Sequence, residues 1–279
     1  LAAVDTGARG QTDFIGMQAM MTDVMAFVDT QFHRDDKTEV TGVSYGFREL
    51  DKLTMGMQAG DLIVLAARPS MGKSALALNV AQAAAMKTRK TAAIFSFEMS
   101  ARSLGMRMLA AESGVNIQRL FSGRIYDHEW TRISPSIGRL MEVPIRICKI
   151  PSATVMEVRA LVRRAWRECG GLSMVVIDYL QMMSGSNTHA NPDTQFAEIS
   201  RGLKLIAEEL QIPVMALSQL NRELEPRPNK RPIMSDLRAS GAIEQDADAI
   251  LFIYRDEVHT KETSEFPGKA EIIVLRGVI

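Results

Sequence analysis

The sequence of 279 residues predicts an α/β protein built on a largely parallel β-sheet that is flanked by helices. From residue 41 onward, short apolar runs alternate with longer segments whose apolar residues recur at helical spacing. Most of the short runs are apolar throughout, which is typical of strands buried on both faces of a sheet. Hydrophobic residues make up 46% of the chain, enough for one large domain with a full core and a short appendage.

The alternation predicts seven strands and at least five helices. We expect the strands at residues 61–67, 91–97, 145–149, 173–178, 213–217, 248–254 and 269–275. We expect the helices at residues 73–86, 100–113, 127–141, 154–168 and 195–211. Residues 183–193 and 218–244 show no clear pattern, but both stretches directly follow expected strands. They therefore belong to the edge at which open α/β sheets bind ligands.

The first part of the chain has a different character, and we treat residues 1–39 as a linker region before a domain at 40–279. Residues 1–12 are small and polar and are expected to form a tail or linker. Apolar residues then recur at helical spacing from Phe14 to Val28, which predicts an amphipathic helix over about 14–32. This helix either packs on another subunit or folds back onto its own domain.

Charge and cysteine content limit the setting and the partners. Lys plus Arg and Asp plus Glu both number 33, so a nucleic acid would have to be held by local charges and amides. The two cysteines, Cys148 and Cys169, lack metal-ligand spacing and indicate a reducing compartment. No apolar stretch is long enough to span a bilayer, and no signal-peptide pattern is present, so we expect a cytoplasmic protein without a membrane partner.

A phosphate-binding loop is expected at residues 67–74, which read Ala-Arg-Pro-Ser-Met-Gly-Lys-Ser and follow the apolar run 62–66. A buried strand that enters a tight turn ending in Gly-Lys-Ser is typical of such loops. Backbone amides of Ser70, Met71 and Gly72, with those of the following helix, would cradle anionic oxygens. Lys73 would reach the terminal phosphates and the Ser74 hydroxyl would bind Mg²⁺. The pattern predicts that the chain binds a nucleoside triphosphate, although Ala67 replaces the motif's first glycine.

Two other expected strands end in carboxylates. Residues 175–178 place Asp178 where a phosphate-loop protein holds Mg²⁺, directly or through water. Residues 92–97 lead to Glu98, on what we expect to be the strand adjacent to the phosphate-loop strand. There a carboxylate can accept a proton from the water that attacks the γ-phosphate. The alternative for each is a local cap, of the next turn for Asp178 and of the helix that begins near residue 100 for Glu98.

A third expected strand, 213–217, has polar residues where it ends. Gln219 could hydrogen-bond the γ-phosphate or the attacking water and so report hydrolysis to the loop that follows. The alternative is a glutamine that only forms a turn. With Lys73, Asp178 and Glu98, Gln219 fits one catalytic site.

These residues resemble the motor domain of DnaB-type replicative helicases. The shared series comprises residues 66–74, 97–99 and 177–181, and then motifs at 216–222, 230–232, 235–238, 240–241, 243–248 and 254–257. An ordered series of this length is far more specific than a phosphate loop alone. The resemblance covers roughly residues 40–274, and the expected helix at 14–32 resembles the family's linker helix, which docks on the neighbouring subunit.

The resemblance implies a RecA-like core that forms a six-membered ring around single-stranded DNA, with ATP bound between subunits. It assigns the family's roles to Lys73 and Ser74 (phosphates and Mg²⁺), Glu98 (general base), Asp178 (metal) and Gln219 (γ-phosphate sensing). A helicase loader and primase would be further partners.

The family's DNA-facing loop corresponds to residues 236–241. Arg238 and the backbone amides near Ala239 and Gly241 would hold phosphates along one strand. The family usually has Glu at the position of Ala239, a change that matters little to a backbone contact. Basic residues of the same long loop either contact DNA as well or belong to a solvated turn; they are Arg222, Arg227, Lys230 and Arg231.

The chain departs from the family after the last expected strand. There the family has a Lys-Gln-Arg-Asn-Gly-Pro run, whose arginine and lysine reach the γ-phosphate in the neighbouring subunit. Residues 275–279 here read Leu-Arg-Gly-Val-Ile, which leaves Arg276 as the candidate for one of these cations. Loss of an arginine finger costs about three to five orders of magnitude in phosphoryl transfer, so this position matters to hydrolysis.

The sequence therefore favours the motor of an ATP-dependent replicative DNA helicase that travels 5′ to 3′, as the resemblance implies. One alternative is a RecA-like recombination or repair ATPase, against which the series at 236–248 argues. The other is a catalytically weak module that binds nucleotide and recruits a loader or primase, which the departure at Arg276 favours.

Overall fold

The computed structural model of the protein describes residues 14–33, 40–185, 190–221, 224, 226–227, 229–237, 240–260, 264 and 266–276. The chain divides into two compact units, Leu1–Thr41 and Gly42–Ile279. Among the described residues, no helix has the length and apolar character needed to cross a bilayer.

The described residues of the first unit include helix α1 (Met17–Phe32), which confirms the helix expected at 14–32 with a start three residues later. None of its residues is buried. Large apolar side chains such as Met17, Met25 and Phe32 are exposed by more than half. An isolated helix gains its stability mainly from packing of an apolar face, so α1 needs a partner surface.

The second unit is built on one sheet of seven strands, in the order β3-β2-β4-β5-β1-β6-β7. The strands are β1 (Leu62–Ala67), β2 (Thr91–Ser96), β3 (Ile145–Lys149), β4 (Leu172–Asp178), β5 (Val214–Gln219), β6 (Ala249–Tyr254) and β7 (Glu271–Arg276). All neighbours are parallel except β7, which runs antiparallel to β6. All seven expected strands are confirmed.

The strand order corrects one expectation. β2, which leads to Glu98, was expected beside the phosphate-loop strand β1, but two strands, β4 and β5, lie between them. The prediction was wrong because apolar runs identify strands without fixing their order in a sheet. Residues at the ends of β2, β4 and β5 still share one edge, because these strands are parallel to β1.

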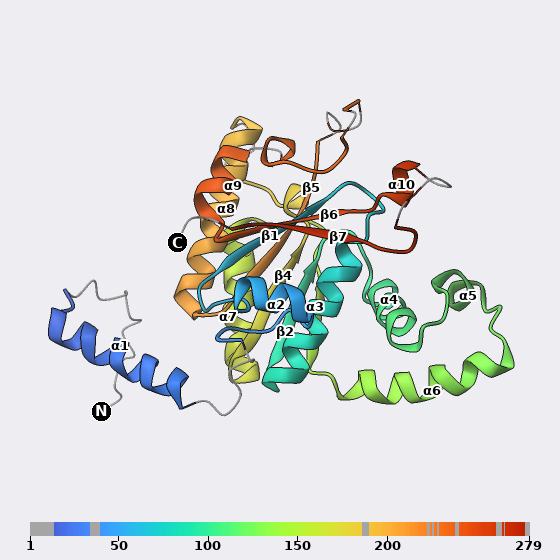
Figure 1. The fold of residues 1–279 in the computed structure, drawn as a ribbon, viewed down its shortest axis with the longest axis horizontal. Coiled ribbons are helices and arrows are strands. Elements are labelled where there is room, and N and C mark those ends of the chain that lie inside the picture. Colours follow the sequence, from blue (N-terminus) through green and yellow to red (C-terminus); the bar gives the residue numbers. More distant parts are fainter. Residues whose placement is uncertain are drawn as a thin grey trace. The chain divides into compact units, whose positions relative to one another are not determined.

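Helices cover both faces of the sheet, and each face has its own core (Figure 1). On one face lie α2 (Arg48–Thr54), α3 (Lys73–Thr88) and α4 (Ala101–Ser113). On the other lie α7 (Val155–Cys169), α8 (Pro192–Leu210) and α9 (Ser240–Asp246). The central strands β1, β4 and β5 are almost fully buried, which explains their unbroken apolar sequences.

An appendage extends from one end of the sheet (Figure 1). It consists of α4, α5 (Ile117–Ser122) and α6 (Asp127–Glu142), which share a small core of Val115, Leu120 and Ile133. Its two long helices were expected, but α5 was not. α2, α9, α10 (Glu257–Thr260) and the 3-10 turns η1 (Leu180–Met182) and η3 (Met234–Asp236) were missed too. Elements of three to seven residues are too short to show helical periodicity.

Candidate functional site

The phosphate loop connects β1 to α3, as the sequence predicts. Ala67 is the last residue of β1 and pairs in register with Gln219 of β5. Because Ala67 is in extended backbone within the sheet, its position does not require the glycine that usually begins the motif. The departure noted in the sequence is therefore compatible with the loop.

The backbone of the loop has the conformation that its last glycine requires. Gly72 has a φ of +100°, which strongly favours glycine, and a Cβ there would meet no atom within 4 Å. The requirement for glycine thus comes from the dihedral angle. Ser70 also has a positive φ, of 66°, while the Met71 side chain is buried in the core and anchors the loop. α3 then begins at Lys73, and Leu76 donates to the Gly72 carbonyl oxygen at 2.9 Å.

Lys73 lies among the groups with which it was expected to act. Burial lowers the pKa of its ammonium group, and the charges of Asp178 and Glu98 oppose this shift. Its Nζ lies 4.9 Å from the centroid of the Tyr179 ring, a cation–π contact at the end of β4. A partly buried cation at the start of a helix is well placed to attract phosphate oxygens.

Asp178 and Ser74, the two residues expected to bind Mg²⁺, lie in contact with each other. Asp178 is the last residue of β4 and is only 5% exposed, and its carboxylate accepts a hydrogen bond from the Ser74 side chain. Burial raises the pKa of Asp178, while Ser74, Lys73 and Arg107 lower it. Two adjacent oxygen donors fit Mg²⁺, which normally takes few protein ligands and completes its shell with water and phosphate oxygens. Among the described residues, no cluster of three or more His, Cys, Asp or Glu side chains could hold a metal by itself.

Glu98 is exposed and follows β2 in a tight turn. The turn is fixed by Ser96, whose hydroxyl donates to the Met99 carbonyl oxygen (2.9 Å) and accepts from its N–H (3.1 Å). Two further contacts hold Phe97: its N–H donates to the Asp178 carbonyl oxygen (2.9 Å), and its own carbonyl oxygen accepts from Lys149 Nζ (2.5 Å). Glu98 thus has an exposed carboxylate on a fixed backbone, and its charge acts on Lys73 and Asp178.

Gln219 ends β5, between the strands that carry the phosphate loop and Asp178. The Gln181 side chain holds its backbone, accepting from the Gln219 N–H (3.4 Å) and donating to its carbonyl oxygen (3.2 Å). The structure therefore brings five predicted residues to one edge of the sheet: Lys73, Ser74, Glu98, Asp178 and Gln219.

The predicted DNA loop is only partly described. Arg238 and Ala239 lie outside the described residues, and Gly241 is exposed in the first turn of α9. The segment before them is well anchored. Asp236 is 4% exposed and accepts hydrogen bonds from the Ile233 N–H and from Arg227, both at 2.8 Å.

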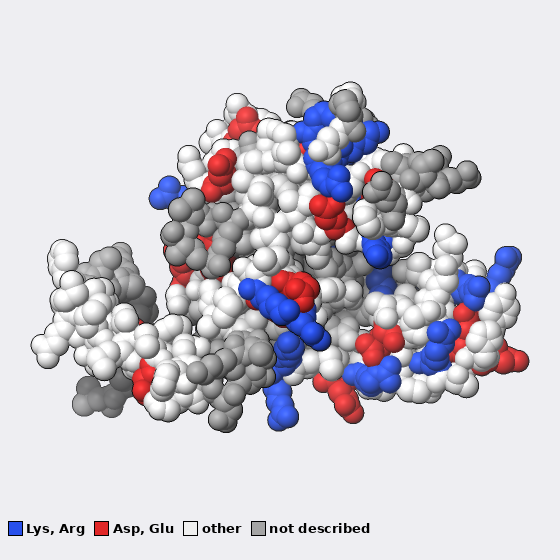
Figure 2. All heavy atoms as spheres, in the orientation of Figure 1, with Lys and Arg blue, Asp and Glu red and all other residues white. Residues whose placement is uncertain are grey.

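Two basic residues of the preceding loop have carboxylate partners. Arg227 pairs with Asp236, and Arg231 pairs with Glu271 at 2.9 Å while its guanidinium lies 5.0 Å from the Tyr254 ring centroid. Figure 2 shows Lys and Arg side chains gathered at the top of the view, where this loop lies in Figure 1. Arg227 is therefore a structural cation of the loop and does not belong to a solvated turn. Arg222 lies outside the described residues.

Arg276 is the last residue of β7, and its side chain lies outside the described part of the chain. In the sheet register it pairs with Ala249, which in turn pairs with Ile63, four residues before the end of β1. At roughly 3.3 Å per residue, this places it about 13 Å along the strands from the residue that enters the phosphate loop. The structure thus separates Arg276 from the phosphate loop of its own chain.

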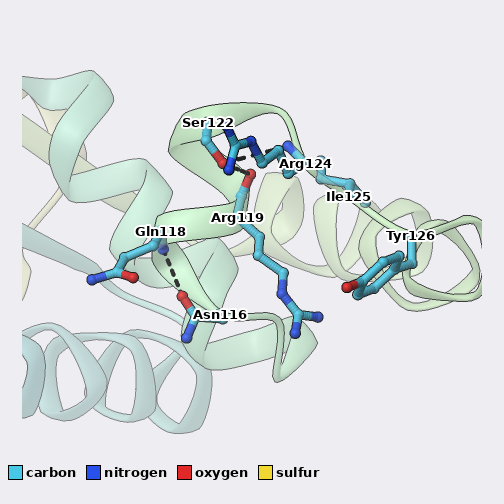
Figure 3. Close-up of a pocket in the computed structure, with 7 residues that line it drawn as sticks. All are labelled: Asn116, Gln118, Arg119, Ser122, Arg124, Ile125 and Tyr126. Carbon is cyan, nitrogen blue, oxygen red and sulfur yellow. Dashed lines mark hydrogen bonds between the residues drawn. The ribbon is translucent and has the colours of Figure 1, made fainter.

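A cavity of about 500 Å³ lies on the appendage, away from the edge that holds the phosphate loop (Figure 3). It is lined by α5 and its flanking residues. Two arginines line it, Arg119 and Arg124. Arg119 is already paired with Glu129 at 2.7 Å, and its guanidinium lies 4.6 Å from the Tyr126 ring centroid. This cavity is not a candidate nucleotide site, because it contains no part of the phosphate loop.

Four residues that contact the site were not predicted as site residues: Arg68, Arg107, Lys149 and Gln181. Arg68 lies in the phosphate loop and donates to the Leu220 carbonyl oxygen, just beyond the end of β5. Arg107 comes from α4 and lowers the pKa of Asp178 by its charge. Lys149 ends β3, the strand next to β2, so only the strand order could have shown that it reaches the Glu98 turn. Gln181 lies in the motif at 177–181 that resembles the helicase family, and this motif was the one indication of its role in the sequence.

Comparison with known proteins agrees with this architecture. The family described as "DnaB-like helicase C terminal domain" matches residues 42–277. The replicative DNA helicase DnaB of Geobacillus stearothermophilus is 49% identical over 239 residues, which cover 85% of this chain and 52% of that protein. The replicative DNA helicase DnaC of Bacillus subtilis is also 49% identical, over 86% of this chain and 53% of its own length. The chain thus spans about half the length of these relatives.

Solved structures give the same result. A solved ATPase domain superimposes with a TM-score of 0.87 at 34% identity and covers 95% of this chain and 92% of its own. A DnaB-like replicative helicase, studied with its interactions with primase, gives a TM-score of 0.84 at 33% identity, covering 95% of this chain and 62% of its own. The fold is therefore the RecA-like ATPase core of DnaB-like proteins, and the chain belongs to the family of DnaB-like helicase C-terminal domains.

Proposed function

We propose that this chain is the motor of an ATP-dependent replicative DNA helicase. The observation that carries the proposal is the convergence of Lys73, Ser74, Asp178, Glu98 and Gln219 at one edge of the sheet, in a chain of the DnaB-like family. The relatives named above, which are replicative DNA helicases, support the same function.

The proposed chemistry is ATP hydrolysis. Amides of Ser70, Met71 and Gly72 bind phosphate oxygens, and Lys73 binds the terminal phosphates. Ser74 and Asp178 would hold Mg²⁺, which supplies charge neutralisation when it is bound. The exposed carboxylate of Glu98 accepts the proton of the attacking water, and Gln219 hydrogen-bonds the γ-phosphate.

We infer that the site is completed by a second copy of the chain, within a six-membered ring. Arg276 lies at the opposite end of the strands from its own phosphate loop, so its guanidinium would act on ATP held by a neighbouring subunit. We assign residues 1–39 as a linker region and 40–279 as the motor domain. The exposed apolar side chains of α1 would then find their partner surface on a neighbouring subunit.

Single-stranded DNA is the proposed track. Arg238, with amides near Ala239 and Gly241, would hold phosphates without reading bases, as a translocating motor requires. The net charge of zero favours such local contacts over a general attraction to nucleic acid. Travel would run 5′ to 3′ in the cytoplasm, with primase and a helicase loader as further partners.

Steady-state ATP hydrolysis with and without single-stranded DNA tests the proposal. We expect DNA-stimulated turnover in the unaltered chain, loss of turnover in Lys73→Ala, and turnover that no longer responds to DNA in Arg238→Ala. Lys52→Ala, on the exposed face of α2, is the control and should behave like the unaltered chain. ATP binding without hydrolysis in any ring-forming preparation would contradict the motor function.

A further inference from the structure

The end of β5 is joined to the phosphate loop by two contacts that the proposed chemistry does not use. Arg68, which follows Ala67 in the loop, donates from Nη1 to the Leu220 carbonyl oxygen at 2.9 Å. The Leu220 N–H donates to the Ala67 carbonyl oxygen at 3.2 Å. Two consecutive residues of the phosphate loop therefore hold both backbone groups of Leu220.

Leu220 is also where the chain turns towards the proposed DNA loop. Its side chain is buried, and its backbone forms an antiparallel bridge with Leu237, which is buried too. The N–H of Asn221 donates to the Asp236 carbonyl oxygen at 2.8 Å. This bridge therefore connects the phosphate loop to Leu237, which directly precedes Arg238 in the sequence.

An arginine inside a phosphate loop would ordinarily be assigned to phosphate binding. Here its guanidinium is partly buried and donates to a backbone carbonyl oxygen on another strand. A hydrogen bond from a charged donor is stronger than one from a neutral donor, and the planar guanidinium holds a fixed geometry that a lysine cannot copy. These features are those of a residue that fixes the position of its neighbours.

We propose that Arg68 is a positioning residue that holds the end of β5, and with it Gln219 and the Leu220–Leu237 bridge, against the phosphate loop. Through this contact the ATP site keeps a fixed position relative to Asp236 and Leu237, where the proposed DNA loop begins. The inference rests on the proposed function, in which Arg68 would help to transmit the response of hydrolysis to DNA.

The first test compares ATP hydrolysis by Arg68→Met and Arg68→Lys with that of the unaltered chain, with and without single-stranded DNA. We expect the stimulation by DNA to fall about tenfold in both variants, while the KM for ATP changes by less than about twofold. Arg48→Met, on the exposed part of α2, removes a similar side chain and should change neither value. A raised KM in Arg68→Met that Arg68→Lys restores would show a phosphate-binding role and overturn the proposal, as would unchanged stimulation.

The second test does not depend on activity. Amide hydrogen exchange of the ligand-free chain should be faster at Leu220 and Asn221 in Arg68→Met, while peptides from β1 and β4 keep their protection and show that the fold is intact. Unchanged exchange at Leu220 would overturn the proposal. If the unaltered chain showed no DNA-stimulated hydrolysis, the proposed function would fail, and the exchange measurement would still decide whether Arg68 holds the end of β5.

Discussion

The side-chain amide of Gln181 pairs with both backbone groups of Gln219, at 3.2 Å from its carbonyl oxygen and 3.4 Å from its nitrogen. The same Nε2 atom lies 3.0 Å from the Ser218 hydroxyl. Gln181 belongs to η1, three residues after Asp178. One side chain thus ties the end of β5 to the strand that carries the proposed metal carboxylate.

Replacing Gln181 with leucine should slow hydrolysis more than it weakens ATP binding. The change removes three polar contacts from the end of β5 and allows Gln219 to move, so we expect kcat to fall about tenfold with little change in KM. Steady-state kinetics would measure this. Gln118→Leu, on the exposed surface of α5, is the matched control. A rise in KM with unchanged kcat would contradict the assignment.

Lys149 should affect Glu98 through the backbone between them. Its Nζ donates to the Phe97 carbonyl oxygen at 2.5 Å, so Lys149→Met frees one side of the turn that carries Glu98. We expect kcat to fall by roughly fivefold to tenfold, and Lys149→Arg to recover most of it because a cationic donor is retained. Nucleotide affinity, measured by fluorescence titration, should stay the same in both variants. Equal kcat in Lys149→Met and the unaltered chain would exclude this role.

Asp178 should reduce stability at neutral pH. Burial raises its pKa in the folded protein above the unfolded value of about 3.9, so the folded state favours the protonated form and the carboxylate costs stability as pH rises. We therefore expect Asp178→Asn to raise the Tm of the ligand-free chain at pH 7 while it abolishes hydrolysis. The gain should shrink as pH falls towards about 4, where both states take up the proton. Thermal unfolding at a series of pH values measures this, with Asp23→Asn at an exposed position as the control. A lower Tm for Asp178→Asn than for the unaltered chain at pH 7 would contradict the prediction.

Lys204 should matter to stability and not directly to catalysis. Its Nζ contacts both carboxylate oxygens of Asp248 (2.9 and 2.8 Å) and the Gly60 carbonyl oxygen, and Asp248 also accepts from the Leu62 N–H at 2.7 Å. Lys204→Met leaves a half-buried carboxylate without its cation, so the free energy of unfolding should fall by about 2 kcal/mol. Urea denaturation would show it. Lys52→Met breaks an exposed pair with Glu49 and should cost less than about 0.5 kcal/mol.

The loss of unfolding free energy in Lys204→Met should depend on pH. Although burial lowers the pKa of Lys204, the hydrogen bond and charge of Asp248 raise it overall above the ordinary value of 10.5. A raised lysine pKa gives stability that is present below the unfolded value and lost as pH rises through the folded value. The difference between Lys204→Met and the unaltered chain should therefore narrow in strongly alkaline buffer.

Much of the fold could be predicted because its signals are local. Most strands are continuous apolar runs, and several of the long helices have a clear period, as in α7, where Thr154 and Glu157 also form a capping box. The start of α8 was placed three residues late because Pro192 is the first residue of the helix and Asn191 caps it, a signal independent of apolar spacing.

The site was predictable only in part. Lys73, Ser74 and Asp178 lie at the ends of strands with strong patterns, and the structure brings them together. Arg68 and Lys149 donate to backbone carbonyl oxygens just beyond the ends of other strands, 152 and 52 residues away in the chain. Such contacts depend on the order of the strands in the sheet, and this order cannot be deduced from a single sequence.

The antiparallel direction of β7 also predicts that two different inactive variants can restore ATP hydrolysis when they are mixed. Arg276 and Lys73 lie at opposite ends of the sheet, so a chain lacking one of them still presents the other intact to a neighbour. In a mixed ring of Lys73→Ala and Arg276→Ala subunits, a junction would hold the unaltered lysine of one chain opposite the unaltered arginine of the next. Mixing two inactive preparations should therefore restore part of the ATP hydrolysis, whereas a chain that completed its own site would remain inactive in any mixture.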